Sequence, residues 1–307
     1  MKKQTTAKIS KVLKQSETKL LKKSNVVGVG IGEKIKDGKR TGRMSLKVYV
    51  EKKIAKEKLS KSDLVPPLIS EVETDVVEVG KIRCLASNRM RARPARGGAS
   101  IGHFQITAGT LGCLVKDKKT GKTLILSNNH VLANSNEAKK GDPILQPGAA
   151  DGGKNPKDKI AKLERWVKIG FGKKANTADA AAALPLNEKD VSPEITSIGM
   201  PKRTVKAKVG LVVQKTGRTT DHTLGEIKDI NATIRVDYDG KTALFRNQIM
   251  TSAMSQGGDS GSLVLDQKRR AVGLLFAGSD LVTLCNPIRD VFKLLDVKSR
   301  YTLYGSY

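Results

Sequence analysis

The chain has 307 residues, which is long enough to bury a sizeable core and to form more than one domain. Its formal net charge of +27 at pH 7 is densest near the start, because residues 1–100 carry 25 Lys and Arg against 10 Asp and Glu. Aromatic residues make up only 4% of the chain and no nucleic-acid-binding motif is found, which argues against binding through stacked bases; contact of the basic N-terminal region with nucleic acid or an anionic membrane stays an open alternative.

Residues 1–23 are predicted to be a basic amphipathic helix or tail. Apolar residues at near-helical spacing stand among eight lysines, and these apolar residues are Ile9, Val12, Leu13, Leu20 and Leu21. The helix has three open roles: docking on its own protein, fraying as a solvated tail, or touching a membrane or nucleic acid. The segment has no continuous apolar region, so no secretory signal is predicted. No apolar stretch of the chain is long enough for a transmembrane helix. The predicted location is the cytoplasm.

Residues 24–85 are predicted to be a small α+β domain. The expected elements are a Gly-spaced strand at 25–32, a turn at 36–38, an alternating strand at 45–50, a short helix near 55–60 and a strand at 74–80. Gly28, Gly30 and Gly32 lack the G-x-G-x-x-G spacing of dinucleotide sites, and no helix starts after them. Nucleotide binding is therefore not predicted.

Residues 86–98 are predicted to be an exposed linker that marks the domain boundary. The stretch holds four arginines, a proline and a Gly pair; the arginines are Arg89, Arg91, Arg93 and Arg96. We expect such a linker to be open to proteolysis.

Residues 99–307 are predicted to be mostly β. Strands are expected at 110–115, 123–127 and 160–167 and, after a Pro- and Ser-bearing connector at 186–203, at 205–215, 224–238, 242–252, 263–265 and 271–276. Asn286 as N-cap, with Pro287 at the first helical position, predicts a C-terminal helix. The loop at 134–158 contains several acids but lacks the spacing of a calcium-binding EF-hand, so neither a metal nor a cofactor is predicted.

The three cysteines are Cys84, Cys113 and Cys285. Their number is odd, and the last two lie inside apolar strand-like runs. This pattern predicts reduced, buried thiols rather than a disulfide framework.

The stretch from Ser255 to Val264 is the strongest functional motif in the chain. Its glycines allow the backbone to turn sharply and to present the hydroxyl of Ser260. The main-chain N–H groups of Gly258 and Ser260 can converge on one point, where they would hold a developing oxyanion. A plain Gly-rich turn between two strands is the alternative interpretation.

A neutral serine hydroxyl needs a base poised near neutral pH, and the chain has only three histidines. His130 stands at a polar turn directly after an apolar strand, whereas His103 and His222 are predicted to make local hydrogen bonds. The acid that orients the base is predicted to be Asp179, at the start of an alanine-rich apolar run, with Asp158 as the alternative.

The order of His130, Asp179 and Ser260, each in this local context, resembles the chymotrypsin-like (trypsin-like) serine peptidases. The resemblance implies two antiparallel six-stranded β-barrels with a C-terminal helix in residues 99–307. It also implies that His130 is the general base, Asp179 its orienting carboxylate and Ser260 the nucleophile of an endopeptidase acting on proteins or peptides. The residues before the linker resemble the N-terminal extension of some bacterial trypsin-like proteins and of the plant NARROW LEAF-type peptidases.

The same resemblance suggests a substrate pocket. In the family pattern the residue six positions before the nucleophile lines the base of the primary pocket, and here it is Met254. The segment around Phe276 resembles the strand that pairs with substrate, with Gly278 at the pocket wall. Met254 in place of an acid implies cleavage after uncharged residues rather than after Lys or Arg.

Two family features are not expected in this chain. Val131 follows His130, so the disulfide common beside the catalytic histidine of secreted members cannot form. In animal trypsins a freed N-terminus pairs with the Asp before the Ser, and Ile101-Gly102 resembles such a start only loosely. Without Ile-Val-Gly-Gly and a neighbouring activation Arg, this maturation is not predicted.

Two other function classes stay open: a non-catalytic binding protein on a peptidase fold, and a basic nucleic-acid-associated factor. We further expect residues 1–98 either to regulate the peptidase or to act only as a folding or solubilising appendage.

Overall fold

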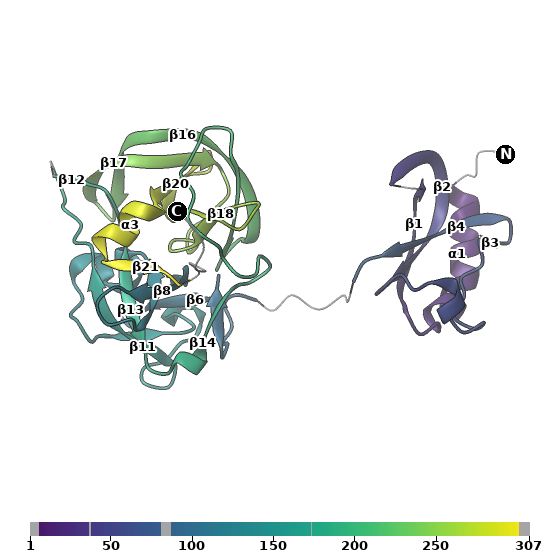
Figure 1. The fold of residues 1–307 in the computed structure, drawn as a ribbon, viewed down its shortest axis with the longest axis horizontal. Coiled ribbons are helices and arrows are strands. Elements are labelled where there is room, and N and C mark those ends of the chain that lie inside the picture. Colours follow the sequence, from purple (N-terminus) through teal and green to yellow (C-terminus); the bar gives the residue numbers. More distant parts are fainter. Residues whose placement is uncertain (1–5, 37, 81–86, 173, 301–307) are drawn as a thin grey trace. The chain divides into compact units, whose positions relative to one another are not determined.

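The computed structural model describes residues 6–36, 38–80, 87–172 and 174–300. It divides the chain into two compact units, Met1–Leu85 and Ala86–Tyr307 (Figure 1). The boundary between the units therefore lies at the start of the predicted linker and not at its end.

The first unit is a four-stranded sheet with one helix packed on it, and its strand order is β1-β2-β4-β3 (Figure 1). The element bounds are α1 (Thr6–Leu21), β1 (Val26–Lys36), β2 (Lys39–Val50), β3 (Leu68–Ile69) and β4 (Val72–Glu78). Ile9, Val12 and Leu20 of α1 are buried in one cluster with Leu46 and Val48 of β2. The amphipathic helix thus docks on its own unit, which was the first of its three predicted roles. The helix predicted near 55–60 is only a short 3₁₀ turn, Lys56–Lys58.

The spaced glycines of β1 have a packing role. A Cβ on Gly30 would lie 2.9 Å from the Tyr49 hydroxyl oxygen, and one on Gly28 would lie 3.2 Å from the Tyr49 ring. These glycines leave room for Tyr49 of β2 to lie across β1, which explains the pattern without a nucleotide.

The second unit begins with an eight-stranded antiparallel sheet of order β21-β8-β9-β13-β11-β10-β6-β7. The strand bounds are β6 (Ser100–His103), β7 (Gly109–Thr110), β8 (Cys113–Asp117), β9 (Thr123–Ser127), β10 (Pro143–Leu145), β11 (Lys159–Trp166), β13 (Ala181–Pro185) and β21 (Val297–Ser299). Its core contains Ile101, Leu114, Ile125, Ile144 and Leu163, one from each of five strands. The short helix α2 (Asn129–Leu132) follows β9 directly and carries His130.

The second large sheet of this unit has seven strands in the order β12-β17-β16-β15-β18-β19-β20, and an additional pairing of β20 with β17 closes six of them into a barrel. The strand bounds are β12 (Ala175–Asn176), β15 (Val212–Gly217), β16 (Asp221–Tyr238), β17 (Lys241–Ser252), β18 (Leu263–Asp266), β19 (Ala271–Gly278) and β20 (Val282–Pro287). As predicted, β16 and β17 form a hairpin that turns at Asp239-Gly240.

The predicted fold class is confirmed: the chain is mostly β, with two barrel-like sheets, antiparallel except for the edge strand β12, followed by the C-terminal helix α3 (Ile288–Leu294). Each sheet has more than six strands because the short strands β7, β21 and β12 add to its ends. The remaining short helices are the 3₁₀ turns Asn134–Asn136, Ala149–Asp151 and Glu188–Asp190. Within the described ranges, no helix combines the length and the apolar character needed to span a membrane.

Residues 87–98 are folded onto the second unit and do not form a free linker as predicted, although several of them, Arg91 and Arg96 among them, are exposed. Strand β5 (Ala95–Gly97) pairs in parallel with β14 (Val191–Ile195), and Ala95 is fully buried. The side chain of Arg91 lies 3.0 Å from the Asp158 carboxylate. Arg93 contacts Gln146 and Arg96 contacts Glu194 in the same way. Three of the four arginines thus have partners distant in the chain, and their density does not indicate an unfolded segment.

The C-terminal helix begins later than predicted. Asn286 is not its N-cap but a fully buried residue of β20, and α3 starts at Ile288. The Asn286 side-chain NH₂ donates a hydrogen bond to Oε1 of Gln248 at 2.6 Å. The amide is therefore committed to the barrel interior and not to the helix end.

The cysteines in the described residues are free and buried, as predicted. Burial raises the pKa of Cys113 and of Cys285 to about 12, so neither thiol is a reactive nucleophile. Cys84 lies outside the described residues.

Candidate active site

His130 and Asp179 meet at one end of the first sheet of the second unit. His130 follows β9, and Asp179 precedes β13, which pairs with β9. Nδ1 of His130 lies 2.5 Å from Oδ2 of Asp179. Asp179 is fully buried, whereas the His130 side chain is 24% exposed. A buried carboxylate on Nδ1 leaves Nε2 as the nitrogen that can accept a proton from a partner outside.

Neighbouring amide groups fix the Asp179 backbone and carboxylate. Oδ1 accepts hydrogen bonds from the backbone N–H of Asn129 at 2.6 Å and of His130 at 3.3 Å. The Asn286 side-chain oxygen accepts the Asp179 N–H at 3.0 Å, and the Asn128 amide donates to the Asp179 carbonyl at 2.7 Å. The acid therefore has one orientation toward the imidazole.

The other histidines, His103 and His222, and the alternative acid, Asp158, have partners elsewhere. Nε2 of His103 lies 3.1 Å from the Asp142 carboxylate, and His222 is paired with an amide oxygen of β15. Asp158 binds the Arg91 guanidinium. Among the candidates from the sequence, only Asp179 contacts His130.

The backbone around Ser260 requires glycine at two positions. Gly258 has φ 95° and Gly261 has φ 98°, a region that other residues avoid. A Cβ on Gly261 would also lie 2.1 Å from the hydroxyl oxygen of Ser127. The Ser260 carbonyl accepts the Thr110 N–H at 2.8 Å, which ties this loop to the first sheet.

The Ser260 hydroxyl donates a hydrogen bond to the Phe276 carbonyl at 3.3 Å. No hydrogen bond between Ser260 and His130 occurs in the part of the chain that the structure describes. Catalytic hydrogen bonds of this kind are often long without substrate and tighten when it binds. The structure thus joins His130 and Asp179 directly, and the contact of Ser260 with the base stays a prediction.

The backbone N–H groups of Gly258 and Ser260 have no hydrogen-bond acceptor among the residues described. The N–H between them, that of Asp259, is used in a turn to the Gln256 carbonyl at 3.0 Å. The N–H groups of Gly258 and Ser260 are thus available to an oxyanion, and their convergence on one point stays a prediction.

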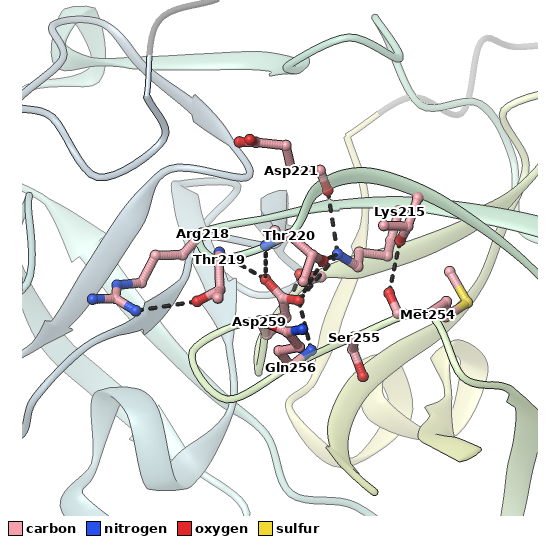
Figure 2. Close-up of polar contacts among 12 residues, drawn as sticks. Lys215, Arg218, Thr219, Thr220, Asp221, Met254, Ser255, Gln256 and Asp259 are labelled. Atoms are coloured by element: carbon pink, nitrogen blue, oxygen red, sulfur yellow. Dashed lines mark hydrogen bonds and ion pairs between the residues drawn. The ribbon is translucent and has the colours of Figure 1, made fainter. Parts of the chain in front are cut away.

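Asp259, next to the candidate nucleophile, forms a buried ion pair with Lys215 of β15 (Figure 2). Both side chains are fully buried, and the Lys215 ammonium lies 3.2 Å from Oδ2 of Asp259. The same ammonium donates to the Asp221 carbonyl at 3.2 Å and to the Thr220 hydroxyl. Three oxygen acceptors thus surround a charge that has no contact with water.

The Asp259 carboxylate is satisfied as completely as its partner. Oδ1 accepts the N–H of Thr219 at 2.8 Å, and Oδ2 accepts the Thr220 hydroxyl at 2.6 Å and the Gln256 N–H at 3.0 Å. Burial opposes ionisation of Asp259, but Lys215 and these hydrogen bonds outweigh it and hold the pKa of the carboxyl below its usual range. The loop that presents Ser260 is therefore anchored by a charge on the second sheet.

The Lys215–Asp259 ion pair takes the place of the pairing between a freed N-terminus and the Asp before the Ser that animal trypsins form. Ile101 is fully buried inside β6. Asp259 already has an ammonium partner in Lys215. Asp259 is thus charge-balanced by Lys215 without a freed N-terminus at Ile101.

A groove of about 960 Å³ lies beside His130, lined by the loop at 105–108, by α2 and by strands of the second sheet. Phe276 and Gly278, two of the predicted substrate-binding residues, line this groove together with Tyr238. Met254 instead lies in the core of the second sheet, 4% exposed. Its place at the base of a substrate pocket stays a prediction.

Three acids of the 134–158 loop are paired with basic side chains. Asp142 contacts His103, Asp151 contacts Arg218 and Asp158 contacts Arg91. Within the described ranges, no group of three or more His, Cys, Asp or Glu side chains is placed to hold a metal ion.

Comparison with known proteins gives a family and a set of similar folds. The family model for the trypsin-like peptidase domain matches residues 109–274, a range that contains all three candidate catalytic residues. No curated protein matches the chain. Thermobifida fusca protease A is 18% identical, with 66% of this chain and 96% of that chain covered and a TM-score of 0.48. Cellulomonas bogoriensis chymotrypsin is 19% identical over 67% and 98% (TM-score 0.48), and Nocardiopsis protease 17% over 66% and 96% (TM-score 0.49).

Proposed function

Because this chain belongs to the trypsin-like peptidase domain family, we propose that it is a serine endopeptidase whose catalytic residues are Ser260, His130 and Asp179. The observation that supports the proposal most strongly is the contact of 2.5 Å between Nδ1 of His130 and the fully buried carboxylate of Asp179. A buried acid on one ring nitrogen of a histidine that lines an open groove fits the role of a general base. The intracellular location stays a prediction of the sequence.

The proposed reaction proceeds through an acyl-enzyme. The Ser260 oxygen attacks the carbonyl carbon of the scissile bond while Nε2 of His130 takes the hydroxyl proton. The N–H groups of Gly258 and Ser260 stabilise the negative oxygen of the tetrahedral intermediate. His130 then gives the proton to the leaving amine, and a water molecule, activated by the same base, hydrolyses the ester.

We expect this peptidase to cleave after uncharged residues more readily than after Lys or Arg. The reason is that Met254 stands where the family pattern would place a pocket acid, and an apolar residue there cannot neutralise a buried cation. Cleavage profiling of a peptide library, with the Ser260→Ala protein as background, measures the preference. A profile dominated by Lys or Arg would show that another residue forms the pocket, and no cleavage above background would count against the endopeptidase itself.

The rival functions give other results in simple assays. A non-catalytic binding protein on this fold would not react with a fluorophosphonate, which labels only an activated serine. A nucleic-acid-associated factor would be retained on DNA at physiological salt and released steeply as salt rises.

Regulation by the first unit is part of the same proposal. We expect the full chain and a chain beginning at Ser87 to differ in rate or in substrate choice on a folded protein substrate. The shorter chain starts at Ser87, because β5 belongs to the second unit and its removal would break the pairing with β14. Equal rates and equal cleavage sites for both chains, on peptide and protein substrates, would leave the first unit with no regulatory role.

A further inference from the structure

The carboxylate of Asp179 has a partner that the sequence did not reveal. The Tyr238 hydroxyl donates a hydrogen bond to Oδ2 of Asp179 at 2.8 Å. This is the same oxygen that lies 2.5 Å from Nδ1 of His130, whereas Oδ1 is held by backbone N–H groups. The atom that orients the imidazole is therefore shared by the base and by a phenol from the other sheet.

Tyr238 is held in place by aromatic contacts. Its ring lies edge-on to His130, with centroids 6.0 Å apart, and edge-on to Phe171 at 5.8 Å. On another side it stacks on Phe245 at 6.2 Å. A ring packed against three others has little rotational freedom, so the direction of its hydroxyl is set by packing as well as by the hydrogen bond.

The hairpin that carries Tyr238 is joined to the segment that leads to Asp179. Tyr238 is the last residue of β16 and pairs with Lys241 across the turn. Strand β12, just before Asp179, pairs in parallel with β17 of the same hairpin. The N–H of Gly172 also donates to the Thr242 carbonyl at 2.9 Å. The hairpin that carries Tyr238 and the segment that leads to Asp179 are thus joined by backbone hydrogen bonds.

The phenol is suited to be a permanent donor. Burial and the neighbouring Asp179 carboxylate both raise the pKa of Tyr238, so its proton is retained. A hydrogen bond to a charged, buried acceptor is also stronger than one between neutral groups.

We propose that Tyr238 is a positioning residue, whose hydroxyl holds Oδ2 of Asp179 in line with Nδ1 of His130. The inference rests on the proposed peptidase function and adds a residue to its machinery. No proton passes through the phenol; it donates to the carboxylate throughout the reaction, while His130 alone exchanges a proton with Ser260 and the leaving group. Hydrolysis would therefore depend on the position of the β16–β17 hairpin of the second sheet, because this hairpin brings the Tyr238 hydroxyl to Asp179, the acid that precedes β13 of the first sheet.

The test is Tyr238→Phe, which removes the hydroxyl and keeps the ring. We expect kcat on a peptide ester to fall about 10-fold or more, the size expected for one hydrogen bond to a charged group, while KM changes less than twofold. Tyr49→Phe, in the first unit, is the matched control and should leave both constants unchanged. Folding of both variants is checked by far-UV circular dichroism, and folding of the second unit also by the fluorescence of Trp166, the only tryptophan of the chain, which lies in β11.

A double-mutant cycle separates positioning from general stabilisation. If Tyr238 acts through Asp179, then Tyr238→Phe should have little effect in the Asp179→Asn background, measured as the rate of fluorophosphonate labelling. An equal fold-loss in both backgrounds, or an unchanged kcat in the single variant, would overturn the role of Tyr238. Labelling of the wild-type protein is measured first, because its absence would remove the proposed function and the positioning role with it.

Discussion

Replacing Ser260 by Ala should abolish covalent labelling by a fluorophosphonate and lower kcat for peptide hydrolysis by about 10⁴-fold or more. The substitution removes the only atom that can form the acyl-enzyme, and any remaining rate comes from binding and the oxyanion donors alone. His130→Ala should have a loss of the same size, because the serine hydroxyl then has no base to take its proton.

Asp179→Asn should fold normally and still lose about 10³–10⁴-fold in kcat. An amide of the same shape keeps the packing, but it has an NH₂ group where Oδ2 stood, and this group favours the imidazole tautomer with the proton on Nε2. Such a histidine cannot accept the proton of Ser260. The loss would therefore come from the wrong tautomer and not from a disturbed fold.

The measurements are steady-state kinetics on a peptide ester and labelling with a fluorophosphonate, read against His222→Ala as control. His222 lies outside the candidate site and is paired with Gln214, so its variant should retain full activity. Full activity in the His130→Ala protein would refute the assignment of the base. Loss of activity in the His222→Ala protein would show that histidine replacement acts through the fold.

The local motifs of the site could be predicted because each depends on residues next to one another in the chain. Ser260 lies among glycines whose positive φ angles shape its own loop, and His130 follows the strand that delivers it. The hairpin turn at Asp239-Gly240 is local in the same way. These features are formed by neighbours in the sequence, and so the sequence shows them.

The residues that hold the acids of the site in place, Lys215 and Tyr238, could not be predicted, because they are far in the chain from the acids that they contact. Lys215 is 44 residues from Asp259, and Tyr238 is 59 residues from Asp179. A single lysine or tyrosine in a strand carries no mark of the acid that it will meet. The error in the linker has the same origin, since Arg91 finds Asp158 only through folding.

Lys215→Met should lower the free energy of unfolding of the second unit by about 3–5 kcal/mol at neutral pH. Methionine has a similar volume, so the main change is electrostatic: Asp259 would be left buried without its ammonium partner. The loop that presents Ser260 and the N–H group of Gly258 depends on that carboxylate, because the N–H groups of Gln256 and Thr219 both bind to it. We therefore expect activity to fall together with stability.

The pH dependence identifies the cause of this loss. In the wild-type protein the pKa of Asp259 is held below its usual range, so the pair contributes stability above the ordinary carboxyl pKa, and this contribution is lost as pH falls. In the variant the unpaired, buried carboxyl should instead favour its protonated form, which relieves the penalty at low pH. The difference in unfolding free energy between the two proteins should accordingly narrow from pH 7 to about pH 4.

Denaturant unfolding followed by the fluorescence of Trp166 measures this difference, because the only tryptophan of the chain lies in the second unit. Lys228→Met is the matched control: its ammonium is half exposed in a surface pair with Glu226, and such pairs contribute less than about 1 kcal/mol. Pairing Lys215→Met with Asp259→Asn should restore part of the stability, because no unpaired charge then remains buried. A penalty that is the same at pH 7 and pH 4, and that the second substitution leaves in place, would mean that Lys215 supports the loop by packing alone.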